Sequence, residues 1–216
     1  MAFVTYCVIA ITAYLLGSIP TGYLVARARH VDIRSLGSGN IGATNVFRTL
    51  GPTAGTVVLL IDFLKGFLAC ILLAPALTDL LLPPPAAQSV PHEIPLLIAG
   101  ITAILGHNYT CWLRFRGGKG IATSAGVLIA LVPWALLIGL GIWLTFFALF
   151  RYVSLASIAA ALTLPLAVWL TGCSLTLILV TLALAVLAVY KHRSNIQRLL
   201  NGTEHRIGSP PKSSTS

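Results

Sequence analysis

Long apolar runs fill most of this chain, and short polar stretches separate them. About 20 consecutive apolar residues form a helix that crosses a bilayer, because a helix satisfies all of its backbone groups within itself. The pattern therefore predicts an all-α, polytopic membrane protein. Seven transmembrane helices are predicted, at residues 3–26, 53–77, 94–109, two within 121–150, 153–170 and 175–190.

Proline and glycine interrupt these runs at definite places. Gly17, Pro20 and Gly22 predict a kink in the inner third of the first span. The run 121–150 is too long for one straight span and contains Pro133, so it predicts a hairpin of two short helices. The proline-rich stretch 79–92 is an outer loop. Residues 1–207 then form a single integral-membrane domain, and 208–216 a disordered cytoplasmic tail.

Composition agrees with a membrane protein: 57% of the residues are hydrophobic, 9% are charged, and the mean hydropathy is +0.92. A net charge of +9 would suggest nucleic acid in a soluble protein. Here the positive-inside rule explains the charge, so no nucleic-acid partner is expected. It orients the N-terminus out and the C-terminus in, with every Lys and Arg except Lys65 on the cytoplasmic side. The four cysteines have no metal or disulfide spacing, so neither a metal nor a cofactor is expected.

The most polar internal stretch is 36–48, LGSGNIGATNVFR. Small residues let backbone N–H groups approach a ligand, and a glycine-rich turn entering a helix can hold an anion. Arg48 adds a bidentate partner for phosphate. The alternative is a flexible polar loop. The candidate ligand-binding residues of this stretch are Gly37, Ser38, Gly39, Asn40, Thr44, Asn45 and Arg48.

Two further polar stretches fall on the same predicted face. In RFRGGKG (114–120), Lys119 stands among Gly117, Gly118 and Gly120, in an order that excludes a Walker motif. In 191–198, His192 and Asn195 share a helical face. Three cationic stretches on one face predict a phosphate site facing the cytoplasm.

Four residues within the spans are candidates for support of that site. Asp62 and Lys65 lie three apart on one helical face, and buried charges at this depth usually pair. A structural ion pair and a role in supporting the site are both open. His107 and Asn108, at the end of the third span, either take part in the site or make a capping or supporting hydrogen bond.

Several motifs in order resemble the bacterial acyl-phosphate:glycerol-3-phosphate acyltransferase family, PlsY. The resemblance implies transfer of a fatty acyl group from acyl phosphate to the 1-hydroxyl of sn-glycerol 3-phosphate in the bacterial inner membrane. It implies Ser38, Arg48, Lys119, Ser157, His192 and Asn195 as functional residues. Thr110 departs from the family, in which proline is common. The motifs are GSIPTGYLVAR, GSGNIGATNVFR, DFLKG, GHNY with FRGGKG, RYVSLASI and HRSNIQRLLNGTE.

Acyl phosphate is an activated mixed anhydride, so no nucleophilic Ser–His pair is required. The chain offers no extended surface for coenzyme A or acyl-carrier protein, so neither is expected to be obligatory, and membrane lipid surrounds the site. No histidine begins the HxxxxD pair of the other large glycerolipid acyltransferase group. A transporter of a phosphorylated solute is the alternative, although its outer side would lack a matching polar cluster.

Overall fold

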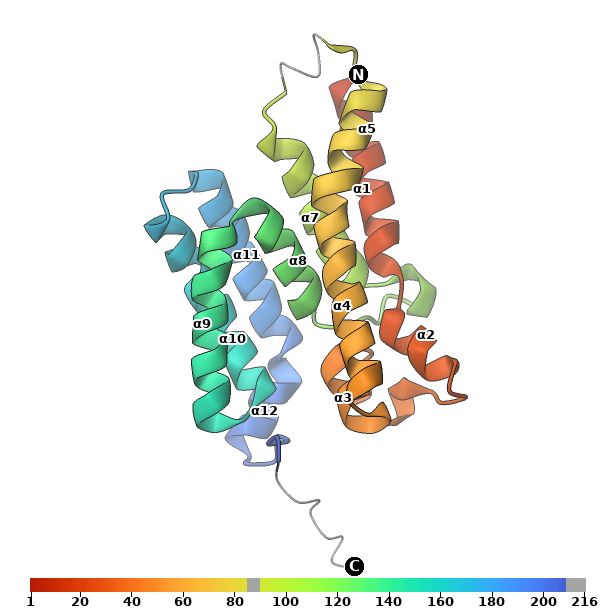
Figure 1. Cartoon of the computed structure of the whole chain (residues 1–216), viewed down its shortest axis with the longest axis vertical. Helices are drawn as coiled ribbons and strands as arrows, with labels where there is room; N and C mark the ends of the chain where they lie inside the picture. Colours follow the sequence, from red (N-terminus) through yellow and green to blue (C-terminus); the bar gives the residue numbers. More distant parts are fainter. Residues whose placement is uncertain (85–89, 209–216) are drawn as a thin grey trace, which may run out of the picture. The chain divides into compact units, whose positions relative to one another are not determined.

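In the computed structural model, residues 1–84 and 90–208 are described, and every regular element among them is a helix. The chain forms two compact units, Met1–Pro133 and Trp134–Ser216, each treated by itself below (Figure 1). The first contains α1 (Ala2–Ser18), α2 (Thr21–Arg27), η1 (Ile33–Ser35), α3 (Ala43–Leu50), α4 (Pro52–Leu68), η2 (Ala69–Leu73), α5 (Ala74–Leu81), α7 (Glu93–Asn108), η3 (Cys111–Leu113) and α8 (Ile121–Leu131). The second contains α9 (Pro133–Phe150), α10 (Val153–Leu170), α11 (Leu175–Lys191) and α12 (Arg193–Leu200).

The predicted all-α membrane architecture is confirmed. Five helical segments of the described residues are long and apolar enough to cross a bilayer, and the bent pair α11–α12 makes a sixth. The predicted count of seven also needs α8, which has only 11 residues. Of the predicted outer loop, residues 85–89 lie outside the described residues, as does the predicted tail beyond Gly208.

Prolines mark the helix breaks, for a local reason. The kink predicted in the first span is a full break at Ile19 and Pro20, because the residue before proline is pushed out of the helical conformation. Pro133 separates α8 from α9 as predicted, but the two helices are unequal, since α9 has 18 residues. Pro75, early in α5, follows the π-helical turn η2, a widened turn that absorbs the clash of a proline ring.

Close helix crossings build the first unit. A Cβ on Gly17 would lie 2.1 Å from the carbonyl oxygen of Ala103, so α1 meets α7 backbone to backbone. A Cβ on Gly66 would lie 2.2 Å from the Thr123 oxygen, and α4 meets α8 in the same manner. Small residues let membrane helices approach closely and gain dispersion contacts that lipid cannot supply.

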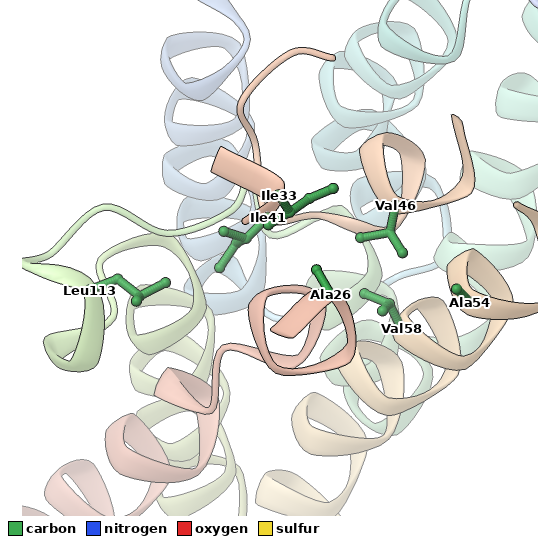
Figure 2. Close-up of a cluster of buried hydrophobic side chains, with 7 residues drawn as sticks. All are labelled: Ala26, Ile33, Ile41, Val46, Ala54, Val58 and Leu113. Carbon is green, nitrogen blue, oxygen red and sulfur yellow. The ribbon is translucent and has the colours of Figure 1, made fainter. Parts of the chain in front are cut away.

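One buried apolar cluster fastens both polar loops of this unit to its helices. Figure 2 shows Ile33, Ile41 and Val46 from the first polar region lying over Ala26 and Val58, with Leu113 of η3 to one side. Ala54 completes the loop-anchoring cluster. Burial of Ile, Val and Leu side chains stabilises by about 1.5–3 kcal/mol each, so the cluster resists separation of the two loops from the helices.

Candidate active site

The first polar loop is shaped by the side chain of Asn45, which is 2% exposed. Its Nδ2 donates to the carbonyl oxygens of Leu36 (3.0 Å) and Asn40 (2.9 Å), and its Oδ1 accepts from the N–H of Ser38 (2.9 Å). These bonds engage both the donor and the acceptor of the amide. Asn45, predicted to bind substrate, therefore serves as the scaffold of the loop.

The other candidate residues of the first polar loop are more exposed to solvent than Asn45. Ser38, Thr44 and Arg48 are exposed, and Arg48 lies three residues after Asn45 on α3. The same short helix therefore carries both the guanidinium and the residue that fixes Ser38.

Backbone geometry explains the glycines of the first loop. Gly37 and Gly39 have φ of 58° and 69°, the left-handed region that costs other residues energy. The side-chain oxygen of Asn40 accepts from the N–H of Gly42 at 2.9 Å, just before α3 begins. The predicted glycine-rich turn entering a helix is thus present.

The second polar loop rests on the end of α7. Gly117 N–H donates to the Asn108 carbonyl (3.2 Å), and Gly118 N–H donates to that of His107 (3.0 Å). Gly120 has φ of 82°, and a Cβ there would lie 2.7 Å from Asn108 Oδ1. The amides of Gly117 and Gly118 are therefore used inside the protein rather than offered to a ligand. Close packing against the end of α7 accounts for these three glycines, and their role in substrate binding stays a prediction.

Lys119 stands at the edge of this packed loop. It is half-buried, and α8 begins two residues later at Ile121. The positive end of a helix dipole therefore adds to the lysine charge, an arrangement that favours an anion.

The predicted pair of Asp62 and Lys65 is confirmed. Lys65 Nζ lies 2.9 Å from Asp62 Oδ1, and each side chain is 3% exposed. Lys65 also donates to the carbonyl of Ile19, at the break between α1 and α2 (3.1 Å). His107 and Asn108 are buried beneath the second loop, as support for that loop requires.

In the second unit, His192 stands at the 57° bend between α11 and α12. Its Nδ1 lies 2.8 Å from the carbonyl oxygen of Ala188. A carbonyl can only accept, so Nδ1 carries a proton, and whenever the ring is neutral its lone pair is on Nε2. The ring is 2% exposed, and the contact with Ala188 holds its position.

Asn195 is held by Glu204, a residue that sequence reasoning did not select. Glu204 Oε1 accepts from Asn195 Nδ2 and from the Ser154 hydroxyl, and Oε2 accepts from Arg198 Nε, each at 2.7 Å. Burial raises the pKa of Glu204, but these hydrogen bonds outweigh it and leave that pKa below its usual value. In the sequence, Glu204 is a single carboxylate within a basic segment, and this pattern could have identified it as a candidate.

Ser157, assigned through the family resemblance, is buried on α10. Its hydroxyl donates to the Val153 carbonyl (2.8 Å) and accepts from Trp143 Nε1 (3.1 Å), which ties α9 to α10. The second unit therefore holds three functional candidates in fixed positions, Ser157, His192 and Asn195.

Apolar helices joined by cationic, glycine-containing loops define the class: this is a multi-pass membrane protein whose candidate site suits an anionic substrate. The chain belongs to the glycerol-3-phosphate acyltransferase family, whose sequence pattern matches residues 7–202 and so spans both units.

Individual relatives agree with this assignment. The glycerol-3-phosphate acyltransferase of Desulforudis audaxviator is 50% identical over 196 residues, which cover 90% of this chain and 92% of the relative. The crystal structure of PlsY, an integral membrane glycerol 3-phosphate acyltransferase, in its glycerol 3-phosphate form is 39% identical with a TM-score of 0.82, covering 94% of this chain and 96% of that one. The lysophosphatidic acid form of PlsY matches with a TM-score of 0.80 and 39% identity, over 94% of this chain and 95% of that one.

Proposed function

We propose that this protein is a glycerol-3-phosphate acyltransferase that uses acyl phosphate as donor and acylates the 1-hydroxyl of sn-glycerol 3-phosphate. The observation that carries the proposal is its similarity, over nearly the whole chain, to PlsY structures in glycerol 3-phosphate and lysophosphatidic acid forms. Those forms correspond to an acceptor and an acylated product. The family resemblance supports acyl phosphate as the donor, as do the short polar loops between the helices of the described residues.

The reaction replaces one acyl–oxygen bond by another. The acceptor hydroxyl attacks the acyl carbon, the bond to the phosphate oxygen breaks, and phosphate leaves with the electron pair. The hydroxyl proton goes to His192 Nε2 or to an oxygen of the leaving phosphate. Because a mixed anhydride is already activated, the protein contributes mainly by holding two phosphates and one hydroxyl in place.

The chemistry of each residue suits it to a different group of the substrates. Arg48 suits the acceptor phosphate, since a guanidinium binds a phosphate monoester with two parallel bonds. Lys119 suits the leaving phosphate, because a compact ammonium beside a helix N-terminus meets growing negative charge. Ser38, Asn195 and His192 orient the acceptor hydroxyl. In this proposal the protein has seven spans in the bacterial inner membrane, and its functional residues face the cytoplasm.

Purified protein tests the proposal directly. Labelled glycerol 3-phosphate should become lysophosphatidic acid with acyl phosphate alone, and replacement of the donor by acyl-coenzyme A or acyl-carrier protein should give little product. Arg48→Ala and Lys119→Ala should each slow the reaction about 30- to 1,000-fold, which corresponds to about 2–4 kcal/mol of transition-state stabilisation. Turnover with acyl-coenzyme A but not with acyl phosphate would overturn the donor assignment.

A further inference from the structure

Three polar side chains meet inside the first unit, where α4 packs against α7. Asp62 Oδ1 lies 2.9 Å from Lys65 Nζ and 3.6 Å from His107 Nδ1. The three side chains are at most 5% exposed. Burying such groups costs free energy unless they compensate one another, so a group of this kind within apolar helices points to a role beyond filling space.

The two partners of Asp62 face different parts of the unit. Lys65 reaches the Ile19 carbonyl, which the proline-induced break leaves at the negative end of α1. His107 lies under the second loop. A Cβ on Gly118 would stand 2.0 Å from His107 Nε2, so the glycine backbone rests on the imidazole edge.

The contact with the ring is reinforced by the backbone. Gly118 N–H donates to the carbonyl of the same histidine, and Gly117 N–H donates to that of Asn108. Lys119 is the next residue. Two consecutive glycines allow many backbone conformations. Here the imidazole and the end of α7 fix the position of this segment.

We propose that His107 is a positioning residue that sets the place of Lys119 at the donor phosphate, with the Asp62 carboxylate 3.6 Å from its Nδ1. The inference rests on the proposed function and deepens it. Its physical basis is that a displacement of about 1 Å at a reacting group can cost about 100-fold in rate. His107 acts through the loop and touches no substrate.

Kinetic coupling tests this role. His107→Ala should raise KM for acyl phosphate about tenfold or lower kcat to a similar extent, with less than about a twofold change in KM for glycerol 3-phosphate. In the Lys119→Ala background, the same change should cost less than about twofold, because the loop no longer carries the ammonium. In the Arg48→Ala background, it should cost its full factor.

A second pair of variants tests the contact itself. Gly118→Ala should impair donor use, since its methyl group collides with the ring, and His107→Ala in the same chain should restore part of the loss by vacating that space. His107→Gln keeps a polar side chain and covers the case in which the alanine variant does not fold. Ile104→Ala, at a buried position one turn earlier on α7, is the matched control for destabilisation alone.

The outcomes separate the two levels of inference. Wild-type protein that forms no lysophosphatidic acid refutes the proposed function. If the wild type is active, three results would each overturn the positioning role. They are a His107→Ala loss that multiplies in both backgrounds, equal changes in the two KM values, and no rescue of Gly118→Ala. His107 would then be a packing residue like Ile104.

Discussion

A few polar side chains shape this protein because each of them forms hydrogen bonds with several groups at once. Asn45 gathers backbone groups from both ends of the first loop, and Glu204 gathers donors from α10 and α12. Each bond contributes about 0.5–1.5 kcal/mol net, and more where one partner is charged. Their main effect is geometric, because they leave the catalytic candidates Ser38 and Asn195 few alternative positions.

Glu204→Gln should weaken both stability and activity. The glutamine no longer accepts a charge-assisted bond from Arg198, so we expect a loss on the order of 1–3 kcal/mol of unfolding free energy at pH 7. The lowered pKa of Glu204 makes the wild type lose this stability as pH falls below about 4.5. Thermal unfolding in detergent between pH 7 and 3 should show a smaller acid effect in the variant.

Asp32→Asn is the control for that acid effect. Hydrogen bonds from Arg34 lower the pKa of Asp32 to about 2, but this carboxylate is exposed, so its contribution is small. If the thermal stability of the wild type and of Glu204→Gln depends on pH in the same way, Glu204 does not anchor Asn195 through its charge.

His192→Asn should raise KM for glycerol 3-phosphate about 10- to 100-fold, equivalent to about 1.4–2.7 kcal/mol, and leave the acidic limb of the pH–rate profile in place. This expectation follows if, as proposed, the imidazole orients the acceptor, since a good leaving group needs little help from a base. Steady-state kinetics from pH 5.5 to 8.5 measure both quantities. Loss of the acidic limb near pH 6–7 with an unchanged KM would instead make His192 the general base.

At the scale of elements, interrupted helices and close crossings position the candidate residues. The break before Pro20, the bend at His192 and the break before Pro133 each place polar backbone or a functional side chain at the end of an apolar helix. Lys119 depends on one crossing in particular, since α8 begins just after it and packs against α4.

Gly66→Ala should disturb that crossing. The added methyl group would lie 2.2 Å from the Thr123 carbonyl, so α8 must move, and we expect destabilisation by about 1–3 kcal/mol with reduced acyl transfer. Gly141→Ala on α9 has no heavy atom within 4 Å of the new methyl group, so its stability should be equal to or slightly above that of wild type. Equal melting temperatures for the two variants would contradict the close α4–α8 contact.

At the scale of the whole molecule, exposed apolar side chains and the placement of Lys and Arg along the chain are the basis of the predicted orientation in the membrane. Large exposed hydrophobic residues occur in both units, as expected for helices whose solvent is the hydrocarbon of the bilayer. The charge distribution supports a cytoplasmic location for the polar loops, because Lys and Arg are retained on that side.

Cysteine labelling tests this orientation. In a variant without the four native cysteines, Ser35→Cys and Thr203→Cys should be protected from an impermeant thiol reagent in intact cells, and Asp79→Cys should react. All three positions are accessible or partly accessible in the fold. Opening the cells should make the protected pair react, and labelling of Ser35→Cys from outside would reverse the orientation.

The sequence by itself determined the features that depend on local composition. Apolar length predicted the membrane helices, and proline predicted the breaks near Pro20 and Pro133. Residue type predicted three cationic stretches and the Asp62–Lys65 pair. The ordered motifs also identified the family.

Only the tertiary structure decided how the polar side chains are used. Gly118 is a glycine because an imidazole from another element occupies the space that its side chain would need. Asn45 is a scaffold because the loop before α3 turns back onto its side chain, and Glu204 is an anchor because Ser154 of α10 meets it only in the folded unit. Hydropathy and spacing describe neighbours along the chain, whereas hydrogen-bond partners depend on the folded structure. The sequence therefore identified the candidate residues, and the tertiary structure showed which groups each of them contacts.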